Sequence, residues 1–113
     1  MATSKKKYEN IIISTLEEYA KMFNMQGDGL EAKVIIDKKG KHYQLLNSGW
    51  RKGDYQFYII FHFDILNEKV WLQENRTDIL IASELIEKGI LKKDIVLGLQ
   101  EPENRTYTGY AAA

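Results

Sequence analysis

The chain contains no cysteine, only one proline, and no long hydrophobic run among its 113 residues. The absence of cysteine excludes disulfide scaffolds, thiolate zinc sites and cysteine nucleophiles, and it is typical of a reducing compartment. The longest apolar runs, such as residues 57–61, are far shorter than the roughly 20 residues of a bilayer-spanning helix. We therefore expect a cytoplasmic protein without a membrane segment.

An excess of either charge is also missing, because 16 Lys and Arg residues balance 16 Asp and Glu residues. Binding to a nucleic acid backbone normally depends on excess positive charge, so direct DNA binding is disfavoured and any contact with DNA is expected to be indirect. Hydrophobic residues make up 44% of the chain, which is enough for a single domain over residues 1–113 with its own core.

The hydrophobic pattern predicts an α+β fold. Apolar residues recur at helical spacing over 5–23, and a second helix is expected over 78–88, with Thr77 as its cap and Gly89 as its end. Between the helices, four β-prone segments predict an antiparallel meander: residues 33–37, 42–47, 55–65 and 69–73. The predicted turns are 38–41 and 67–68, and residues 48–54 form a longer loop. Residues 91–99 fit either a helical turn or a short edge strand, and Pro102 begins a C-terminal tail.

Residues 55–65 are the strongest strand in the sequence. Six large apolar side chains share one parity and are expected to form the core face: Tyr55, Phe57, Ile59, Phe61, Phe63 and Ile65. His62 and Asp64 then share the opposite face, about 7 Å apart. They suit either a proton-carrying or ligand site, or a local hydrogen bond on a partly covered sheet face, and we favour the local hydrogen bond.

Signals for catalysis and for cofactors are weak. His42 is the second of only two histidines, and a two-histidine metal site requires its turn to fold over the sheet. Glu31-Ala-Lys33 resembles a nuclease triplet, but no suitable partner acid accompanies it. We expect no catalytic residue, no metal and no cofactor.

Aromatic residues near loops and in the tail are better candidates for recognition, since exposed aromatic side chains often anchor interfaces. The predicted partner-binding residues are Trp50, His62, Asp64, Trp71, Tyr107 and Tyr110. The two tail tyrosines are expected to dock either on their own domain or on a second chain. Open sheet edges also allow a homo-oligomer.

A set of motifs in a fixed order resembles the XisI family, the fdxN element excision controlling factors. The segments that carry the resemblance are 8–20, Gly49-Trp50, His62 to Ile65, Lys69 to Gln73, Thr77-Asp78, Glu84 to Ile90, Asp94 to Gly98 and Pro102 to Tyr110. The resemblance implies a cyanobacterial accessory factor in recombinase-driven excision of a DNA element during heterocyst differentiation, alongside a partner called XisH. It implies no catalytic residue.

Taken together, the residues and the resemblance predict a non-enzymatic regulatory factor that binds a XisH-like protein and so affects DNA excision indirectly. Two alternatives remain. One is a nucleic-acid-processing enzyme subunit that uses His62, Asp64 and Glu74. The other is a factor that binds DNA directly through its lysine clusters, at residues 5–7, 38–41, 51–52 and 92–93.

Overall fold

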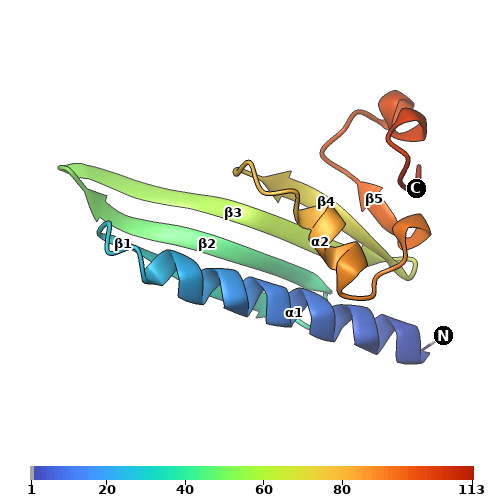
Figure 1. Cartoon of the computed structure of the whole chain (residues 1–113), viewed down its shortest axis with the longest axis horizontal. Coiled ribbons are helices and arrows are strands. Elements are labelled where there is room, and N and C mark those ends of the chain that lie inside the picture. The colour runs from blue at the N-terminus through green and yellow to red at the C-terminus, as the bar shows by residue number, and fades with distance from the viewer. Residues whose placement is uncertain (1) are drawn as a thin grey trace.

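The computed structural model describes the backbone of residues 2–113 and the side chains of residues 6–113. A five-stranded sheet in the order β1-β2-β3-β4-β5 carries a long helix on one face (Figure 1). The elements are α1 (Ala2–Asn24), β1 (Leu30–Asp37), β2 (His42–Arg51), β3 (Asp54–Leu66), β4 (Lys69–Asn75), α2 (Ile81–Glu87) and β5 (Ile95–Leu97), with 3-10 helices η1 (Lys92–Asp94) and η2 (Pro102–Tyr107). In this part of the chain, no helix combines the length and the hydropathy that a bilayer span requires.

The α+β prediction is confirmed, with one correction to the number of strands. Strands β1 to β4 form the predicted antiparallel meander. Residues 91–99 contain both of the predicted alternatives, since η1 is a helical turn and β5 is an edge strand that pairs parallel to β4. The sheet therefore has five strands and not four.

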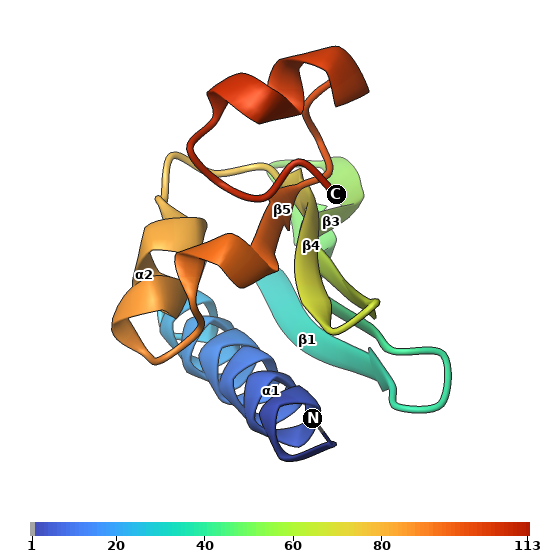
Figure 2. The same ribbon diagram turned by 90° about the vertical axis from the view of Figure 1, so that its right-hand side faces the viewer.

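Helix α1 crosses one face of the sheet and buries its apolar side against it (Figure 2). Ile12 and Leu16 are fully buried there. The hydroxyl of the buried Tyr43 on β2 donates a hydrogen bond to Glu9 of α1 at 2.5 Å. At the other end of α1, the Asn24 side chain makes two hydrogen bonds with the backbone of Ala32. It accepts one from the N–H and donates one to the carbonyl. These contacts fix the position of the helix along the sheet.

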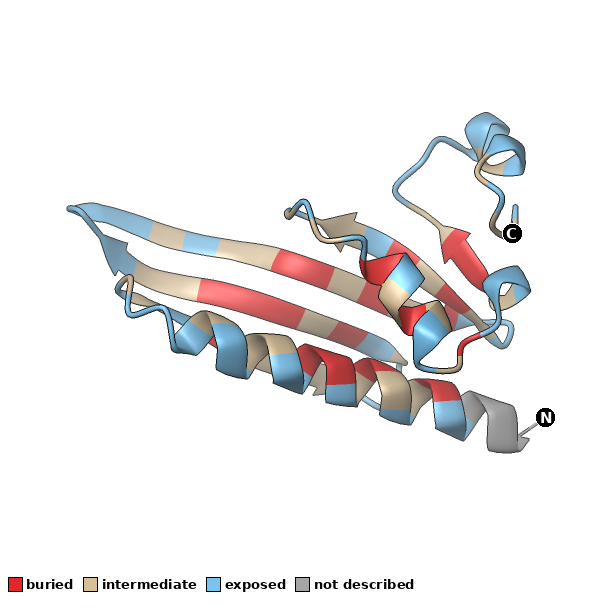
Figure 3. Cartoon of the chain, viewed as in Figure 1, coloured by how far each residue is buried: buried red, intermediate tan, exposed pale blue. Residues whose placement is uncertain are grey.

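Neither α1 nor α2 lies on the opposite face of the sheet, which we call the uncovered face (Figure 2). This uncovered face carries both histidines, Asp64 and Trp50, because residues of β2 and β3 alternate between the helix side and the open side. Buried residues concentrate in the middle of β2 and β3 and along α1, whereas the end of the β2–β3 hairpin is exposed (Figure 3).

The β2–β3 hairpin is longer and tighter than the sequence suggested. Lys52 and Gly53 form its turn with φ of 54° and 84°, so both residues adopt the left-handed conformation of a two-residue turn. Arg51 pairs with Asp54 directly beside it. The predicted long loop over 48–54 is therefore wrong, and Trp50 lies within a strand.

A bulge in β3 also corrects the predicted core face. Leu45 pairs with Phe61 and Leu46 with Ile59, which leaves Ile60 as an extra residue in β3. An inserted residue reverses which face the following side chains occupy. Phe61, Phe63 and Ile65 lie in the core as predicted, but Tyr55 and Phe57 lie on the uncovered face.

Two further local predictions have mixed outcomes. The turn between β3 and β4 does consist of Asn67 and Glu68, with left-handed φ of 52° and 63°. Helix α2, however, begins at Ile81 and not near Asp78, and its cap residue Leu80 makes no side-chain capping bond. Thr77 instead accepts a hydrogen bond from the N–H of Ile79 before the helix starts. Gly89 ends the helix with φ of 116°, as predicted.

Candidate functional site on the uncovered sheet face

The uncovered face brings together both histidines and one carboxylate. His42 begins β2 and lies opposite Asp64 of β3 in the strand register. Its Nδ1 is 2.6 Å from Asp64 Oδ1, and Nε2 of His62 is 2.8 Å from the same oxygen. The predicted proximity of His62 and Asp64 is present. The contact of His42 with Asp64 was not predicted, because it depends on the β2–β3 register.

Two glutamines surround this cluster of His42, His62 and Asp64. Gln44, the cross-strand neighbour of His62, places its Oε1 at 2.9 Å from His62 Nδ1. Gln73, the extra residue at a second bulge where β3 meets β4, donates to Asp64 Oδ2 at 3.3 Å. Both rings and the carboxylate are thus held in defined orientations by neighbouring side chains.

Electrostatics couple the members of the cluster. The hydrogen bond to Asp64 raises the pKa of His42 above its ordinary value of 6.5. Partial burial alone would raise the pKa of Asp64, but hydrogen bonds from His42 and His62 lower it below its ordinary 3.8. The cluster therefore stabilises a negative carboxylate next to a positively charged imidazole.

The C-terminal tail covers one end of the uncovered face. The guanidinium of Arg105 lies 5.1 Å above the ring of Trp71 and donates hydrogen bonds to the carbonyls of Gly98 and Gln100, both at 3.1 Å. Trp71 is therefore partly covered by η2 of the tail. Tyr110 also docks on its own domain, where it lies under the ammonium group of Lys92, while Tyr107 is 85% exposed.

Three aromatic side chains are exposed together on the distal half of the β2–β3 hairpin. Trp50, Tyr55 and Phe57 are 65%, 56% and 64% exposed. We call these three residues the tip surface. The rings of Trp50 and Tyr55 face each other across the hairpin with centroids 5.3 Å apart. Strand β4 pairs with β3 only over residues 61–66, so the edge of β3 beside the tip surface has no β4 partner (Figure 1).

The carboxylates proposed for an enzyme do not assemble into one site. Glu74 lies opposite His62 in the register, but its carboxylate interacts with Arg76 at 3.6 Å. Glu31 and Lys33 form an exposed pair at 3.7 Å on the edge strand, and Asp28 faces Arg51 at 3.7 Å. Each acid thus has a basic partner of its own, as expected for surface ion pairs.

The lysine clusters are divided between the two ends of the molecule. The start of α1, the β1–β2 turn and η1 lie at one end, whereas Arg51 and Lys52 lie at the hairpin tip (Figures 1 and 2). The side chain of Lys5 lies outside the described residues. Asp37 and Asp94 lie beside two of the three clusters at the first end, which reduces the local positive charge.

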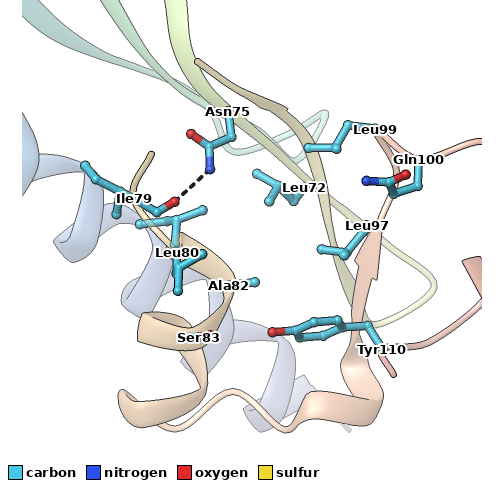
Figure 4. Close-up of a pocket in the computed structure, with 11 residues that line it drawn as sticks. Leu72, Asn75, Ile79, Leu80, Ala82, Ser83, Leu97, Leu99, Gln100 and Tyr110 are labelled. Carbon is cyan, nitrogen blue, oxygen red and sulfur yellow. Dashed lines mark hydrogen bonds between the residues drawn. The ribbon is translucent and has the colours of Figure 1, made fainter. Parts of the chain in front are cut away.

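A separate apolar cavity of about 340 Å³ lies between α2, β4, β5 and the tail (Figure 4). Its wall is mainly aliphatic, and the ring of Tyr110 closes one side of it. Its apolar lining includes Leu72, Ile79, Leu80, Leu97, Leu99 and Tyr110. The Asn75 side chain donates to the carbonyl of Ile79 at 2.9 Å and holds the loop that precedes α2.

Comparison with known proteins decides the family. The sequence model described as XisI protein matches residues 1–112. The chain belongs to the XisI family. The crystal structure of a XisI-like protein from Anabaena variabilis has 38% sequence identity and a TM-score of 0.89, and the match covers 96% of this chain and 99% of that one.

A second crystal structure of the XisI family agrees with the first. The fdxN element excision controlling factor XisI from Anabaena variabilis is 30% identical, with a TM-score of 0.83, over 97% of this chain and 99% of that one. No curated protein sequence matches the chain. The family resemblance inferred from the motif order is confirmed, as is the fold that places the tip surface and the histidine cluster on one sheet face.

The sequence pattern assigned Tyr55 and Phe57 to the core, and it did not place His42 beside His62 and Asp64 in the sheet. The run Tyr58-Ile59-Ile60-Phe61 contains four consecutive apolar residues, which breaks the alternation of a regular strand. That run was the available signal for a bulge. Lys52-Gly53 was the signal for a tight turn that would bring Trp50 into β2.

Proposed function

We propose that this XisI-family protein controls excision of a DNA element without catalysing a reaction, by binding a XisH-like protein through the tip surface. The observation that carries the proposal is the exposure of Trp50, Tyr55 and Phe57 side by side on the uncovered face of the sheet. A solved relative of 30% identity is itself described as an excision controlling factor.

The physical argument starts from the free energy of the exposed rings. Burying roughly 100 Å² of each ring in an interface contributes about 2.5 kcal/mol per ring. Tryptophan and tyrosine are enriched among residues that dominate binding energy, particularly when they cluster. The unpaired edge of β3 beside these rings offers backbone N–H and C=O groups to an added strand, which supports binding of a protein segment.

The charge distribution favours a protein partner over DNA. The chain has no net charge, and its basic clusters occupy opposite ends of the molecule. Of these clusters, the one near the tip surface is Arg51 and Lys52, and Arg51 interacts with Asp28. Phosphate contacts that give strong DNA affinity need several unpaired cations on one surface. DNA excision is therefore affected through the partner.

The proposal is tested by co-purification with a XisH-type protein. We expect the unmodified chain to retain the partner, and Trp50→Ser and Phe57→Ser each to lose it. Tyr107→Ser is the matched control, because Tyr107 is an exposed aromatic residue in the tail, outside the tip surface. Retention by both tip variants together with loss by Tyr107→Ser would assign the interface to the tail and refute the tip surface.

A further inference from the structure

The cluster of His42, His62 and Asp64 lies apart from the tip surface and plays no part in the proposed function. We propose that these three residues form a binding site for a divalent transition-metal ion, for which Zn²⁺ is the representative. The sequence made such a site conditional on the turn of His42 folding over the sheet. In the structure His42 is instead the first residue of β2, where it pairs with Asp64 of β3.

The geometry of the donor atoms fits a metal ion. One nitrogen from each histidine and one carboxylate oxygen all lie within 4.8 Å of one another. Zinc–ligand bonds of about 2.0–2.1 Å in a tetrahedral site separate neighbouring ligand atoms by roughly 3.3 Å. The two contacts to Asp64 Oδ1, at 2.6 and 2.8 Å, need to lengthen by less than an ångström to admit the ion. Small rotations of the side chains provide that change.

The hydrogen bonds around the rings favour a cation at this point. His62 Nδ1 lies 2.9 Å from Gln44 Oε1, and His62 Nε2 lies 2.8 Å from Asp64 Oδ1. In the tautomer whose Nδ1–H donates to Gln44, the Nε2 lone pair points at the carboxylate, and a positive charge must lie between these two electron-rich atoms. A proton on Nε2 supplies it to one ring, whereas a metal ion supplies it to both rings at once. A histidine whose second nitrogen donates to an oxygen is the usual arrangement of a metal ligand.

The backbone and the surroundings also suit a metal site. All three ligands lie in hydrogen-bonded strands, and His42 and Asp64 are direct cross-strand partners, so the positions of their Cα atoms are fixed. The His42 side chain is 54% exposed on the uncovered face, which leaves a path for the ion and room for a water as fourth ligand. Gln73 orients the free oxygen of Asp64. Two imidazoles with one carboxylate favour Zn²⁺, Co²⁺ or Ni²⁺ over Mg²⁺ or Ca²⁺.

The test is a Zn²⁺ titration of the full chain, free of any histidine tag, followed by calorimetry and by NMR of the imidazole nitrogens. Because His42 and His62 are the only histidines, the two rings give the whole imidazole spectrum. We expect one ion per chain with a dissociation constant of about 10 μM or tighter. Nδ1 of His42 and Nε2 of His62 should shift together.

Variants give the decisive comparison. Asp64→Asn is expected to weaken Zn²⁺ binding by about tenfold or more. Glu31→Gln makes the same change of charge on the same face, roughly 20 Å away along β1, and should change affinity by less than about twofold. His42→Ala, at an exposed position, provides a ligand deletion that keeps the core intact. The proposal is overturned by no binding below about 1 mM, by a shift of one ring only, or by equal affinity of Asp64→Asn and the unmodified chain.

Discussion

Phe57 and Phe61 lie on opposite faces of β3, although they are four positions apart and an unbroken strand would place both on the same face. The extra residue Ile60 between them causes the reversal. The bulge moves Phe57 out of the core and into the tip surface, and it keeps Phe61 packed against Tyr19 of α1 at a centroid distance of 5.7 Å.

Truncating these two phenylalanines should therefore have very different effects. Phe61→Ala removes a fully buried ring, and we expect it to lower the free energy of unfolding by about 3–5 kcal/mol. Phe57→Ala removes a ring that is 64% exposed and should cost less than about 1 kcal/mol. Urea denaturation of both variants gives the comparison. Equal losses would mean that β3 runs without the bulge and that both rings are in the core.

Gly49 of β2 lies very close to Gly29, so adding a side chain at Gly49 should destabilise the fold. Its φ is 140°, and a Cβ added there would lie 2.5 Å from the backbone carbonyl oxygen of Gly29. Gly49→Ala is expected to destabilise the fold by roughly 2–3 kcal/mol, because both the backbone and the contact are strained. Gly27→Ala is the control, since Gly27 also has positive φ but open space around it. It should cost only about 1 kcal/mol. A smaller loss for Gly49→Ala than for Gly27→Ala would contradict the predicted clash.

The pairing of His42 with Asp64 should give stability a defined pH dependence. His42 has a raised pKa, so its contribution is complete below pH 6.5 and is lost as the pH rises through the raised value. Asp64 has a lowered pKa, so its contribution is present above pH 3.8 and is lost as the pH falls through the lowered value. Both contributions to stability are therefore complete between pH 3.8 and pH 6.5.

The measurement is an NMR titration of the His42 ring in metal-free buffer, together with urea midpoints across pH. We expect the titration midpoint of His42 to lie above 6.5 and to return toward 6.5 in Asp64→Asn. The Glu31→Gln variant should leave it unchanged, because Glu31 pairs with Lys33 at the far end of β1. An unshifted midpoint in the unmodified chain would show that the two side chains do not pair in solution.

Arg105 should determine how firmly the tail is held. It contacts the ring of Trp71 and two backbone carbonyls at once, a geometry that a lysine ammonium group does not reproduce. Arg105→Lys is therefore expected to speed amide exchange over residues 99–113 by about tenfold, with little change in the exchange of β3. Arg76→Lys, which lies over Tyr58 at the other end of β4, is the control and should not affect the tail. Unchanged exchange in the tail of Arg105→Lys would refute this role.

The sequence predicted the order and the kind of nearly every element, because the helical spacing of α1 and the alternation in β3 depend on local pattern. The predicted core face of β3 was wrong on one side of the inserted residue Ile60. The alternation of side chains predicts the correct face for the residues from Phe61 to Ile65 but the wrong face for Tyr55 and Phe57. The cause is the bulge at Ile60, which depends on the pairing of β3 with Leu45 and Leu46. The late start of α2 has a similar cause, because Asn75 and Thr77 use their side chains to shape the preceding loop.

The candidate sites, like the fold, were predictable only where they depend on local sequence. His62 and Asp64 lie two residues apart in one strand, so their proximity was predictable from local geometry. His42 joins them only through the β2–β3 register, which the tight turn at Lys52-Gly53 and the bulge together determine. The position of the tail tyrosines depends on the contacts of Arg105 and Lys92, which no local pattern indicates.

The most direct test of whether this protein acts by binding a partner is a calorimetric titration of the purified chain with a XisH-type protein. We predict a one-to-one complex with a dissociation constant in the micromolar range or tighter, weakened by about tenfold or more in Phe57→Ser. Tyr107→Ser should bind like the unmodified chain. Absence of association at micromolar concentrations, or equal affinity of the unmodified chain and Phe57→Ser, would contradict partner binding through the tip surface.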